Sequence, residues 1–357
     1  MGRGARLALL LAVLASCKPR ATPPSPDAKP ANSTVQAVTR APAGFVKGQL
    51  HAHTSQSADS KTPPADVQRW YEAHGYDFVV FTDHNRITDT PDTAVLTMPG
   101  AELTRNLRLC EPPPLPNKHC LLHMNALFTT QTEGAIDLGD LVGPSRRDVY
   151  RAEIARARAL GGLPMLNHPN MESTADEALL AELTKDDLTL LEVGNMSWDS
   201  ESAGSATQPS TEQVWDRLLA RGLRVFATVT DDAHHYDDAA ALSARGQRHF
   251  VGDLGFVVVR AEKNAAAIRA AVERGDFYGS SGVVFSKYEL GPAAIALETS
   301  DGAPVKFEAI GKGGEVLHTV TGPRFDFAIE ASHGPYVRVR ASRPDGAFAF
   351  TQAVLRK

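Results

Sequence analysis

The chain has 357 residues, of which 43% are hydrophobic and 22% are charged, and its formal net charge at pH 7 is -5. This balance is typical of a globular protein with one large domain and a smaller one. The acidic excess argues against a nucleic-acid coat protein, which would present a basic face. After residue 15, no apolar run approaches the roughly 20 residues that a membrane-spanning helix needs.

Residues 1–17 have the order of a targeting segment. Arg3 and Arg6 precede an apolar run, residues 7–15, which is too short to cross the roughly 30 Å of a bilayer core. The tetrapeptide LASC that follows resembles a bacterial lipobox in which Cys17 carries the lipid. The alternative is an ordinary signal peptide with an incidental cysteine. The resemblance implies a cell-envelope lipoprotein that faces the periplasm and is held in the outer membrane by the lipid on Cys17.

The next segment, residues 18–44, is rich in Pro, Ala, Ser and Thr, which predicts a disordered tether. From residue 45 to residue 285, short apolar runs alternate with helical patterns. This alternation predicts an α/β domain with a mostly parallel sheet, and seven or eight repeats favour a barrel over an open sheet. Residues 286–357 contain only strand-like runs, which predict a small all-β domain. The expected strands of the α/β part are 45–50, 78–82, 98–103, 121–128, 163–167, 188–194, 224–230 and 254–260, and the expected helices are 64–73, 148–159, 175–183, 212–219 and 264–273.

Besides Cys17, the chain has two cysteines, Cys110 and Cys120, on either side of a Pro-rich segment. In an oxidising periplasm this spacing predicts a disulfide, and two free thiols are the alternative. The spacing does not fit the paired Cys-x-x-Cys pattern of a structural zinc site.

Histidines and carboxylates follow the ends of successive expected strands. In barrel enzymes, the working residues lie at the C-terminal ends of the strands. His51 and His53 end the first strand, and their side chains point to the same face because the side-chain period of a strand is two. Imidazole and carboxylate ligands suit Zn, Mn or Fe, and burying so many ionisable groups without a cation would be costly.

The order of these motifs resembles the polymerase-and-histidinol-phosphatase (PHP) superfamily of metallohydrolases. The motifs are HAH at 51–53, TDHN at 82–85, His123, NHP at 167–169 and DAH at 232–234. The segments TEQVWD at 211–216 and FTQ at 350–352 are similar to those of its CehA/McbA branch of carbaryl-hydrolase-like proteins. The resemblance implies a distorted (β/α)7, TIM-like barrel with two to three divalent metal ions. The implied metal ligands are His51, His53, Asp59, His84, Glu102, His123, His168, Asp232 and His234.

Two of these positions depart from the family pattern. Asp59 stands in SADS, where the family has Ser-Asp-Gly, so it is displaced by one residue. Asp231 occupies a position that is usually small, so either Asp231 or Asp232 can be the ligand, and we favour Asp232.

Clustered cations lower the pKa of a bound water towards about 7 and so supply hydroxide at neutral pH. No Gly-x-Ser-x-Gly elbow is present, and we predict a metal-dependent hydrolase that uses metal-activated hydroxide. Asp231 or His235 is the expected proton donor.

The favoured substrate is a small phosphate mono- or diester, which Arg86, Lys61 or Arg105 would hold. If all three cations point to solvent, a carboxylic or carbamate ester becomes the favoured substrate. A third hypothesis is a catalytically inactive, metal-binding envelope lipoprotein.

Overall fold

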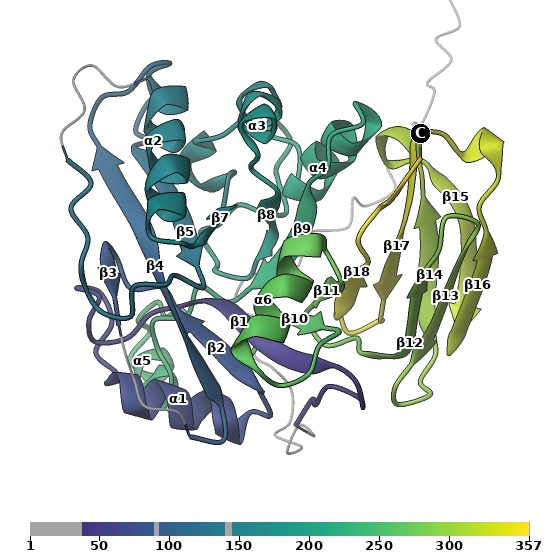
Figure 1. Ribbon diagram of the computed structural model, residues 1–357, viewed down its shortest axis with the longest axis horizontal. Coiled ribbons are helices and arrows are strands. Elements are labelled where there is room, and N and C mark those ends of the chain that lie inside the picture. The colour runs from purple at the N-terminus through teal and green to yellow at the C-terminus, as the bar shows by residue number, and fades with distance from the viewer. Residues whose placement is uncertain (1–37, 89–92, 140–144, 357) are drawn as a thin grey trace, which may run out of the picture. The chain divides into compact units, whose positions relative to one another are not determined.

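The computed structural model describes residues 38–88, 93–139 and 145–356 (Figure 1). Val38–Lys357 form one compact unit. The predicted signal segment with Cys17, and the predicted tether up to residue 37, lie outside the described residues. Within the described ranges, no helix has both the length and the apolar character needed to cross a membrane.

The fold is mixed α/β, with a large mixed sheet and few helices. The α/β part contains strands β1 (Val46–Ala52), β2 (Phe78–Phe81), β3 (Arg86–Ile87), β4 (Leu96–Leu107), β5 (Cys120–Leu127), β6 (Gly134–Ala135), β7 (Leu163–Leu166), β8 (Leu190–Asn195), β9 (Phe226–Thr230), β10 (Phe256–Val259) and β11 (Phe277–Ser280). Its helices are α1 (Pro64–Ala73), α2 (Arg146–Ala159), α3 (Glu177–Leu183), α4 (Thr211–Ala220), α5 (Ala239–Ala244) and α6 (Ala265–Arg274).

The strands of the large sheet follow the order β15-β14-β17-β18-β11-β10-β1-β2-β4-β5-β7-β8-β9. The pairs β1–β2, β2–β4, β7–β8 and β8–β9 are parallel, whereas β4–β5, β5–β7 and β1–β10 are antiparallel. The expected mostly parallel sheet is therefore found only in part. Parallel strands need a long crossover, usually a helix, but an antiparallel pair does not, and the segment between β4 and β5 contains no helix.

The end of β9 lies beside the end of β1. Ala233 forms a parallel bridge with Ala52, and the backbone N–H groups of Asp232 and His53 donate to the carbonyls of His51 and Ala233 at 3.1 and 2.9 Å. This bridge joins the two ends of the path β1-β2-β4-β5-β7-β8-β9. The polar residues that follow these strands are thereby drawn towards one region.

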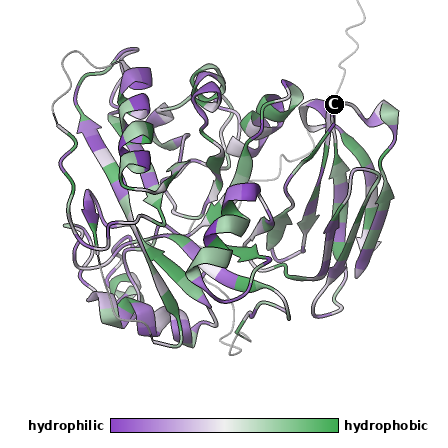
Figure 2. Cartoon of the chain, viewed as in Figure 1, coloured by the Kyte–Doolittle hydropathy of each residue, from purple (hydrophilic) through white to green (hydrophobic). Residues whose placement is uncertain are grey.

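Buried apolar side chains explain the strands, and residues suited to helix ends explain where the helices begin and end. All four residues of β2 are buried, and Figure 2 shows that the strands carry most of the hydrophobic colour. Helix α1 begins at Pro64, whose fixed φ suits a first helical turn. Helix α4 begins with a capping box between Ser210 and Gln213, and α6 ends at Gly275 with φ 81°.

The C-terminal part consists of β12 (Phe285–Leu290), β13 (Ala294–Thr299), β14 (Val305–Ile310), β15 (Val316–Gly322), β16 (Arg324–Ala328), β17 (Tyr336–Ser342), β18 (Phe348–Phe350) and β19 (Val354–Leu355), with short 3-10 turns. β12, β13 and β16 form a three-stranded sheet, whereas β18 pairs with β11 and so extends the large sheet. The expected β-rich region is thus continuous with the α/β part through hydrogen bonds.

Hydrogen bonds from residues 211–216 and 350–352 strengthen this connection. In the 211–216 segment, Asp216 accepts hydrogen bonds from Nε and an Nη of the buried Arg338 at 2.7 and 2.6 Å. In the 350–352 segment, the side-chain amide of Gln352 pairs with both the N–H and the carbonyl of Ala227, each at 2.9 Å. Gln352 therefore satisfies backbone groups at the edge of β9, as a neighbouring strand would.

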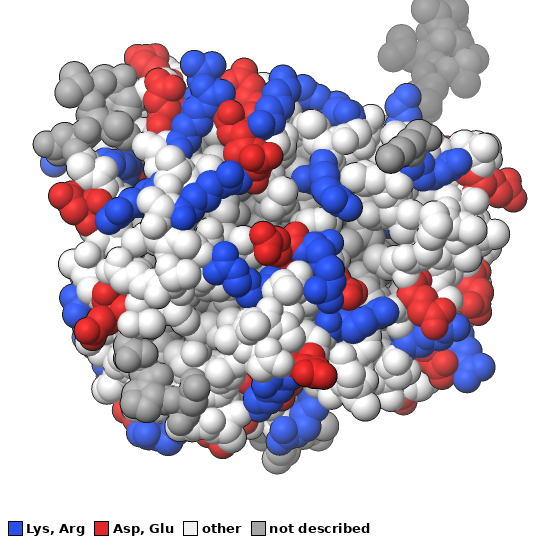
Figure 3. Space-filling view, viewed as in Figure 1, with Lys and Arg blue, Asp and Glu red and all other residues white. Residues whose placement is uncertain are grey.

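The predicted disulfide joins Cys110 to Cys120. On the outside of the chain, basic and acidic side chains are interspersed over the face seen in Figure 3. Arg151 and Asp186, whose Nε and Oδ2 lie 2.7 Å apart, form one of the surface ion pairs of the described residues.

Candidate metal centre

The histidines of β1 point to one face, as their spacing predicts. Nε2 of His51 and Nε2 of His53 each lie 3.2 Å from Oδ1 of Asp232, in the segment that follows β9. Both imidazoles are fully buried. Two ring nitrogens and a carboxylate oxygen therefore converge on one point inside the protein.

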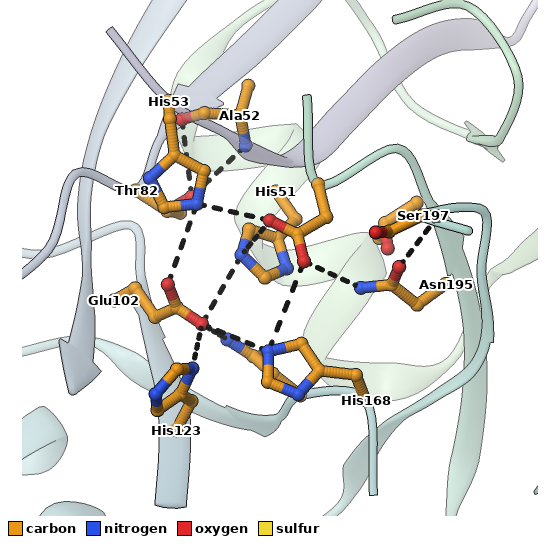
Figure 4. A network of polar contacts seen from close by, with 12 residues as sticks. His51, Ala52, His53, Thr82, Glu102, His123, His168, Asn195 and Ser197 are labelled. Carbon is orange, nitrogen blue, oxygen red and sulfur yellow. Dashed lines mark hydrogen bonds and ion pairs between the residues drawn. The ribbon is translucent and has the colours of Figure 1, made fainter. Parts of the chain in front are cut away.

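Glu102, on β4, lies at the middle of the histidines (Figure 4). Its Oε1 is 3.2 Å from Nδ1 of His123 and 3.3 Å from Nε2 of His168. Its Oε2 is 2.9 Å from Nδ1 of His84 and 3.5 Å from Nε2 of His53. Since its two oxygens face different sets of nitrogen atoms, this carboxylate can contact two cations at once.

The candidate ligand atoms fall into three groups, within each of which they lie no more than 4.8 Å apart. Every ligand implied by the sequence resemblance is present in at least one group. The groups are His53, Asp59, His84 and His234; His51, His53 and Asp232; and Glu102, His123 and His168.

A second layer of polar groups holds the imidazoles. Nδ1 of His51 is 2.6 Å from Oε1 of Glu192, and Nδ1 of His53 is 2.9 Å from Oγ of Ser57. Nε2 of His123 is 2.7 Å from Oδ1 of Asn106. In each case the other ring nitrogen faces the cluster. Metal-binding histidines characteristically use their second nitrogen in this way, which fixes the tautomer and the ring orientation.

Sequence reasoning missed Glu192. Its two oxygens accept hydrogen bonds from the hydroxyl of Thr230 at 2.7 Å and from the backbone N–H of His168 at 2.7 Å. The signal was an acidic residue in the apolar run LTLLEVGN, where a buried carboxylate requires partners.

The donor set fits a cation. Nε2 of His51, Nε2 of His53 and Nδ1 of His123 are buried and have no hydrogen-bond partner among the described residues. Burial raises the pKa of a carboxyl, yet the imidazoles of His123 and His51 hold the pKa of Glu102 well below its usual range. Unpartnered ring nitrogens that face ionised carboxylates form an environment that a divalent cation completes.

The backbone turns sharply at two of the ligands. His168, after β7, has φ 23°, and Asp232, after β9, has φ 55°. Such conformations are uncommon for residues other than glycine and persist where surrounding contacts impose them. At both positions the turn brings a side chain into the cluster.

Asp59 and Asp232, the two aspartates that depart from the family pattern or adjoin a departure from it, both lie beside histidines of the cluster. Oδ2 of Asp59 is 3.1 Å from Nε2 of His84 and 3.4 Å from Nε2 of His234, so its displacement in the motif leaves it within reach of the cluster. Asp232, not Asp231, belongs to a ligand group. From the sequence, the preference for Asp232 rests on the family resemblance alone.

The side chain of Asp231 points away from the cluster and is held by hydrogen bonds. Its carboxylate accepts hydrogen bonds from Nε2 of Gln49 and from the backbone N–H groups of Asp253, Leu254 and Gly255, at 2.7–2.8 Å. Burial raises its pKa to about 7, although these N–H groups oppose the shift. An acid held by this many donors serves to fix the β9–β10 region. This placement argues against the predicted role of Asp231 as proton donor.

The other predicted donor, His235, lies beside the ligand His234. Its Nδ1 accepts a hydrogen bond from the N–H of Phe250 at 3.1 Å, so its proton is held at Nε2. The side chain is partly exposed.

The three side chains predicted to bind phosphate differ in their surroundings. Arg105 donates to the carbonyls of Leu138 and Gly139, and it lies on the face of β4 opposite to Glu102 because strand side chains alternate. The expectation for Arg105 is therefore wrong. Arg86 and Lys61 are exposed, and neither forms an ion pair with a described residue.

Comparison with known proteins adds no assignment. No family model matches the chain, and no curated protein matches it.

Proposed function

We propose that this protein is a metal-dependent hydrolase of the PHP type, with the nine-residue cluster as its active centre. The observation that carries the proposal is the convergence of buried, unpartnered imidazole nitrogens on Glu102 and Asp232. The strand path from β1 to β9 and the bridge between Ala52 and Ala233 support a distorted (β/α)7 barrel, in which antiparallel β5 and the helix-free connections are the distortions.

The nine side chains would hold two or three divalent ions, one for each group or with Glu102 shared between groups. Nitrogen and oxygen ligands without a thiolate suit Zn, Mn or Fe. When bound, such ions lower the pKa of water and stabilise negative charge that develops on an attacked ester.

The remaining steps belong to side chains of the chain itself. Glu192 orients His51 through Nδ1, and Ser57 orients His53. His235 holds a proton at Nε2 beside the cluster, and we assign it, in preference to Asp231, the role of donor to the leaving group.

The proposed substrate is a small phosphate mono- or diester. Arg86, two residues after the ligand His84, and Lys61, two residues after Asp59, are exposed cations without ion-pair partners in the described part of the chain. A carboxylic or carbamate ester is the second candidate, which the engagement of Arg105 with the carbonyls of Leu138 and Gly139, away from the cluster, favours. We further propose, from the sequence alone, that the protein is a periplasmic lipoprotein anchored through Cys17 to the outer membrane.

The test is turnover by the metal-loaded full chain. The substrates are p-nitrophenyl phosphate, bis-p-nitrophenyl phosphate and p-nitrophenyl acetate, and the variants are His51→Ala and His168→Ala. His318→Ala, on exposed β15, is the matched control.

We expect phosphoester turnover in the wild type and the control and its loss in both site variants. Turnover of the acetate alone would replace the phosphoesterase proposal with the acyl-ester alternative. Metal binding without turnover of any ester would favour the inactive, metal-binding protein.

A further inference from the structure

An aromatic surface adjoins the metal centre. The ring of Phe250 lies 5.2 Å from the ring of the ligand His234 and 6.0 Å from that of His235, measured between centroids. On the same ring, Trp198 stacks at 5.8 Å with an interplanar angle of 27°. We name Phe250 and Trp198 the aromatic rim. The rim extends outward from a metal ligand without interruption.

Phe250 is held firmly in this position. Its carbonyl accepts hydrogen bonds from the backbone N–H groups of both His234 and His235, at 3.0 and 2.9 Å. Its own N–H donates to Nδ1 of His235 at 3.1 Å. Three hydrogen bonds thus fix this residue of the β9–β10 loop against the segment that carries two site residues.

The backbone that precedes Trp198 is tied to the cluster. Trp198 follows Ser197, whose N–H donates to Oδ1 of Asn195 at 2.9 Å, and Nδ2 of Asn195 in turn donates to the ligand Asp232 at 3.1 Å (Figure 4). The indole is nevertheless 51% exposed, and it is the one aromatic side chain among the exposed large hydrophobic residues of the described chain. A large aromatic ring that lies at the edge of the proposed active centre and is half exposed to water is a typical binding surface.

The rim also carries positive charge. The guanidinium carbon of Arg248 lies 4.0 Å from the centroid of the Trp198 ring, a cation–π distance. Arg248 forms no ion pair within the described ranges. The nearest acid in sequence to Trp198, Asp199, accepts a hydrogen bond from the hydroxyl of Ser197 instead. An exposed cation beside an aromatic surface suits a ligand that combines a flat ring with negative charge.

We infer that the aromatic rim is a subsite for the planar, aromatic leaving group of the substrate ester. This inference rests on the proposed function and narrows it: the substrate class is an aryl phosphate rather than an alkyl or sugar phosphate. With the phosphate at the metal centre, the aryl group lies along Phe250 and Trp198, and Arg248 contributes attraction for the anionic ester.

The experiment measures binding of two non-hydrolysable probes, phenylphosphonate and methylphosphonate, to the metal-loaded full chain by calorimetry. Neither probe has a leaving group, so the ratio of the two dissociation constants reports recognition of the ring alone. We expect phenylphosphonate to bind about tenfold more tightly, which is the size of one good stacking contact. Trp198→Ala should abolish this ratio and Trp198→Phe should retain most of it.

Leu109→Ala is the matched control, since Leu109 is an apolar side chain that is 79% exposed. It should leave the ratio unchanged. Equal affinities for the two probes in the wild type, or a ratio that survives Trp198→Ala, would overturn the subsite and leave the proposed function standing. Failure of both probes to bind the metal-loaded wild type would overturn the subsite and the phosphoesterase proposal together.

Discussion

Among the individual residues, Glu102 shows how much chemistry one buried side chain can organise. It is 1% exposed, and its two oxygens face five imidazoles at 2.9–3.5 Å. The same strand explains why Arg105 fails as a phosphate-binding residue. Residues 102 and 105 are separated by an odd number of positions, so an unbroken strand directs their side chains to opposite faces. This outcome was derivable from the sequence once β4 was recognised as continuous.

Other features of the site could not be derived from the sequence. The choice between Asp231 and Asp232 depends on the positive φ of Asp232, which no local pattern in the segment TDDAH predicts. Likewise, the partners of His53 and His123, Ser57 and Asn106, are polar residues of ordinary loops and strand ends. Tertiary contacts alone identify them as part of the site.

Glu192→Gln tests the supporting layer. The variant keeps the shape of the side chain but removes the negative charge that faces Nδ1 of His51 at 2.6 Å. Loss of such an outer partner typically weakens metal affinity by about 10- to 100-fold, and we expect a loss in this range. Competition with a chromophoric chelator measures it. Glu133→Gln, at an exposed position, is the control, and equal affinity in the two variants would exclude a supporting role for Glu192.

Glu153→Leu tests a buried acid outside the centre. Glu153, on α2, is 1% exposed, and neither oxygen has a hydrogen-bond partner among the described residues. Burial raises its pKa well above 4.5, and Arg105 only partly opposes the shift. Removing an unpaired buried acid should stabilise the metal-free protein at pH 8 by about 1–3 kcal/mol.

The raised pKa of Glu153 makes the stability of the folded protein depend on pH in a defined direction. Because the folded-state pKa of Glu153 is raised, this carboxyl binds more protons in the native protein than in the unfolded chain above pH 4.5. This group's contribution to stability is present below that pH and is lost as the pH rises through the folded-state pKa. Urea unfolding at pH 5 and pH 8 should show a larger fall in the wild type than in Glu153→Leu. Parallel curves would contradict the assignment, and Glu273→Leu, at an exposed position of α6, is the control.

At the scale of elements, alternating apolar runs located the main strands and helices. The expected helix 64–73 coincides with α1, and the expected strand 163–167 contains β7. The direction of each strand was harder to predict from the sequence, because a buried strand has the same apolar pattern in either orientation. The segment between Cys110 and Cys120 did indicate strand direction. It is short and rich in proline, so it cannot form the helix of a βαβ crossover. This favours the antiparallel β4–β5 pair that the structure contains.

The contact between α4 and β17 depends on a buried ion pair. Arg338 is fully buried and Asp216 is 3% exposed, and two hydrogen bonds join them. Asp216→Asn leaves the guanidinium with one charged partner, Glu212, whose Oε1 lies 2.9 Å from an Nη of Arg338. Because the two hydrogen bonds to a buried carboxylate are weakened, we expect the free energy of unfolding to fall by up to about 3–5 kcal/mol. Chemical denaturation measures the effect.

The double variant Asp216→Leu with Arg338→Leu removes both charges and should be less destabilised than the sum of its single variants. As a control, Glu298→Gln breaks the exposed pair with Arg324 and should change stability by less than about 1 kcal/mol. Additive effects of the two buried changes would show that the pair does not couple α4 to β17.

The molecule as a whole brings candidate metal ligands from segments far apart in the sequence, from His51 to His234, into one centre. Metal binding at this centre would therefore link many elements of the α/β part. Removal of the ions by a chelator should lower the melting temperature, because each site filled at 100 times its dissociation constant adds about 2.7 kcal/mol to stability. Calorimetry before and after chelation checks this expectation. An unchanged melting temperature would mean that the cluster folds without bound metal.

We propose that the cluster around Glu102 binds several metal ions. Mass spectrometry measures the metal content after reconstitution of the full chain with Zn, Mn or Fe and removal of free ions. We expect two or three ions per chain in the wild type and in Glu133→Gln, and at least one fewer in Glu102→Gln. Less than one ion per wild-type chain with every metal would exclude a multinuclear metal centre.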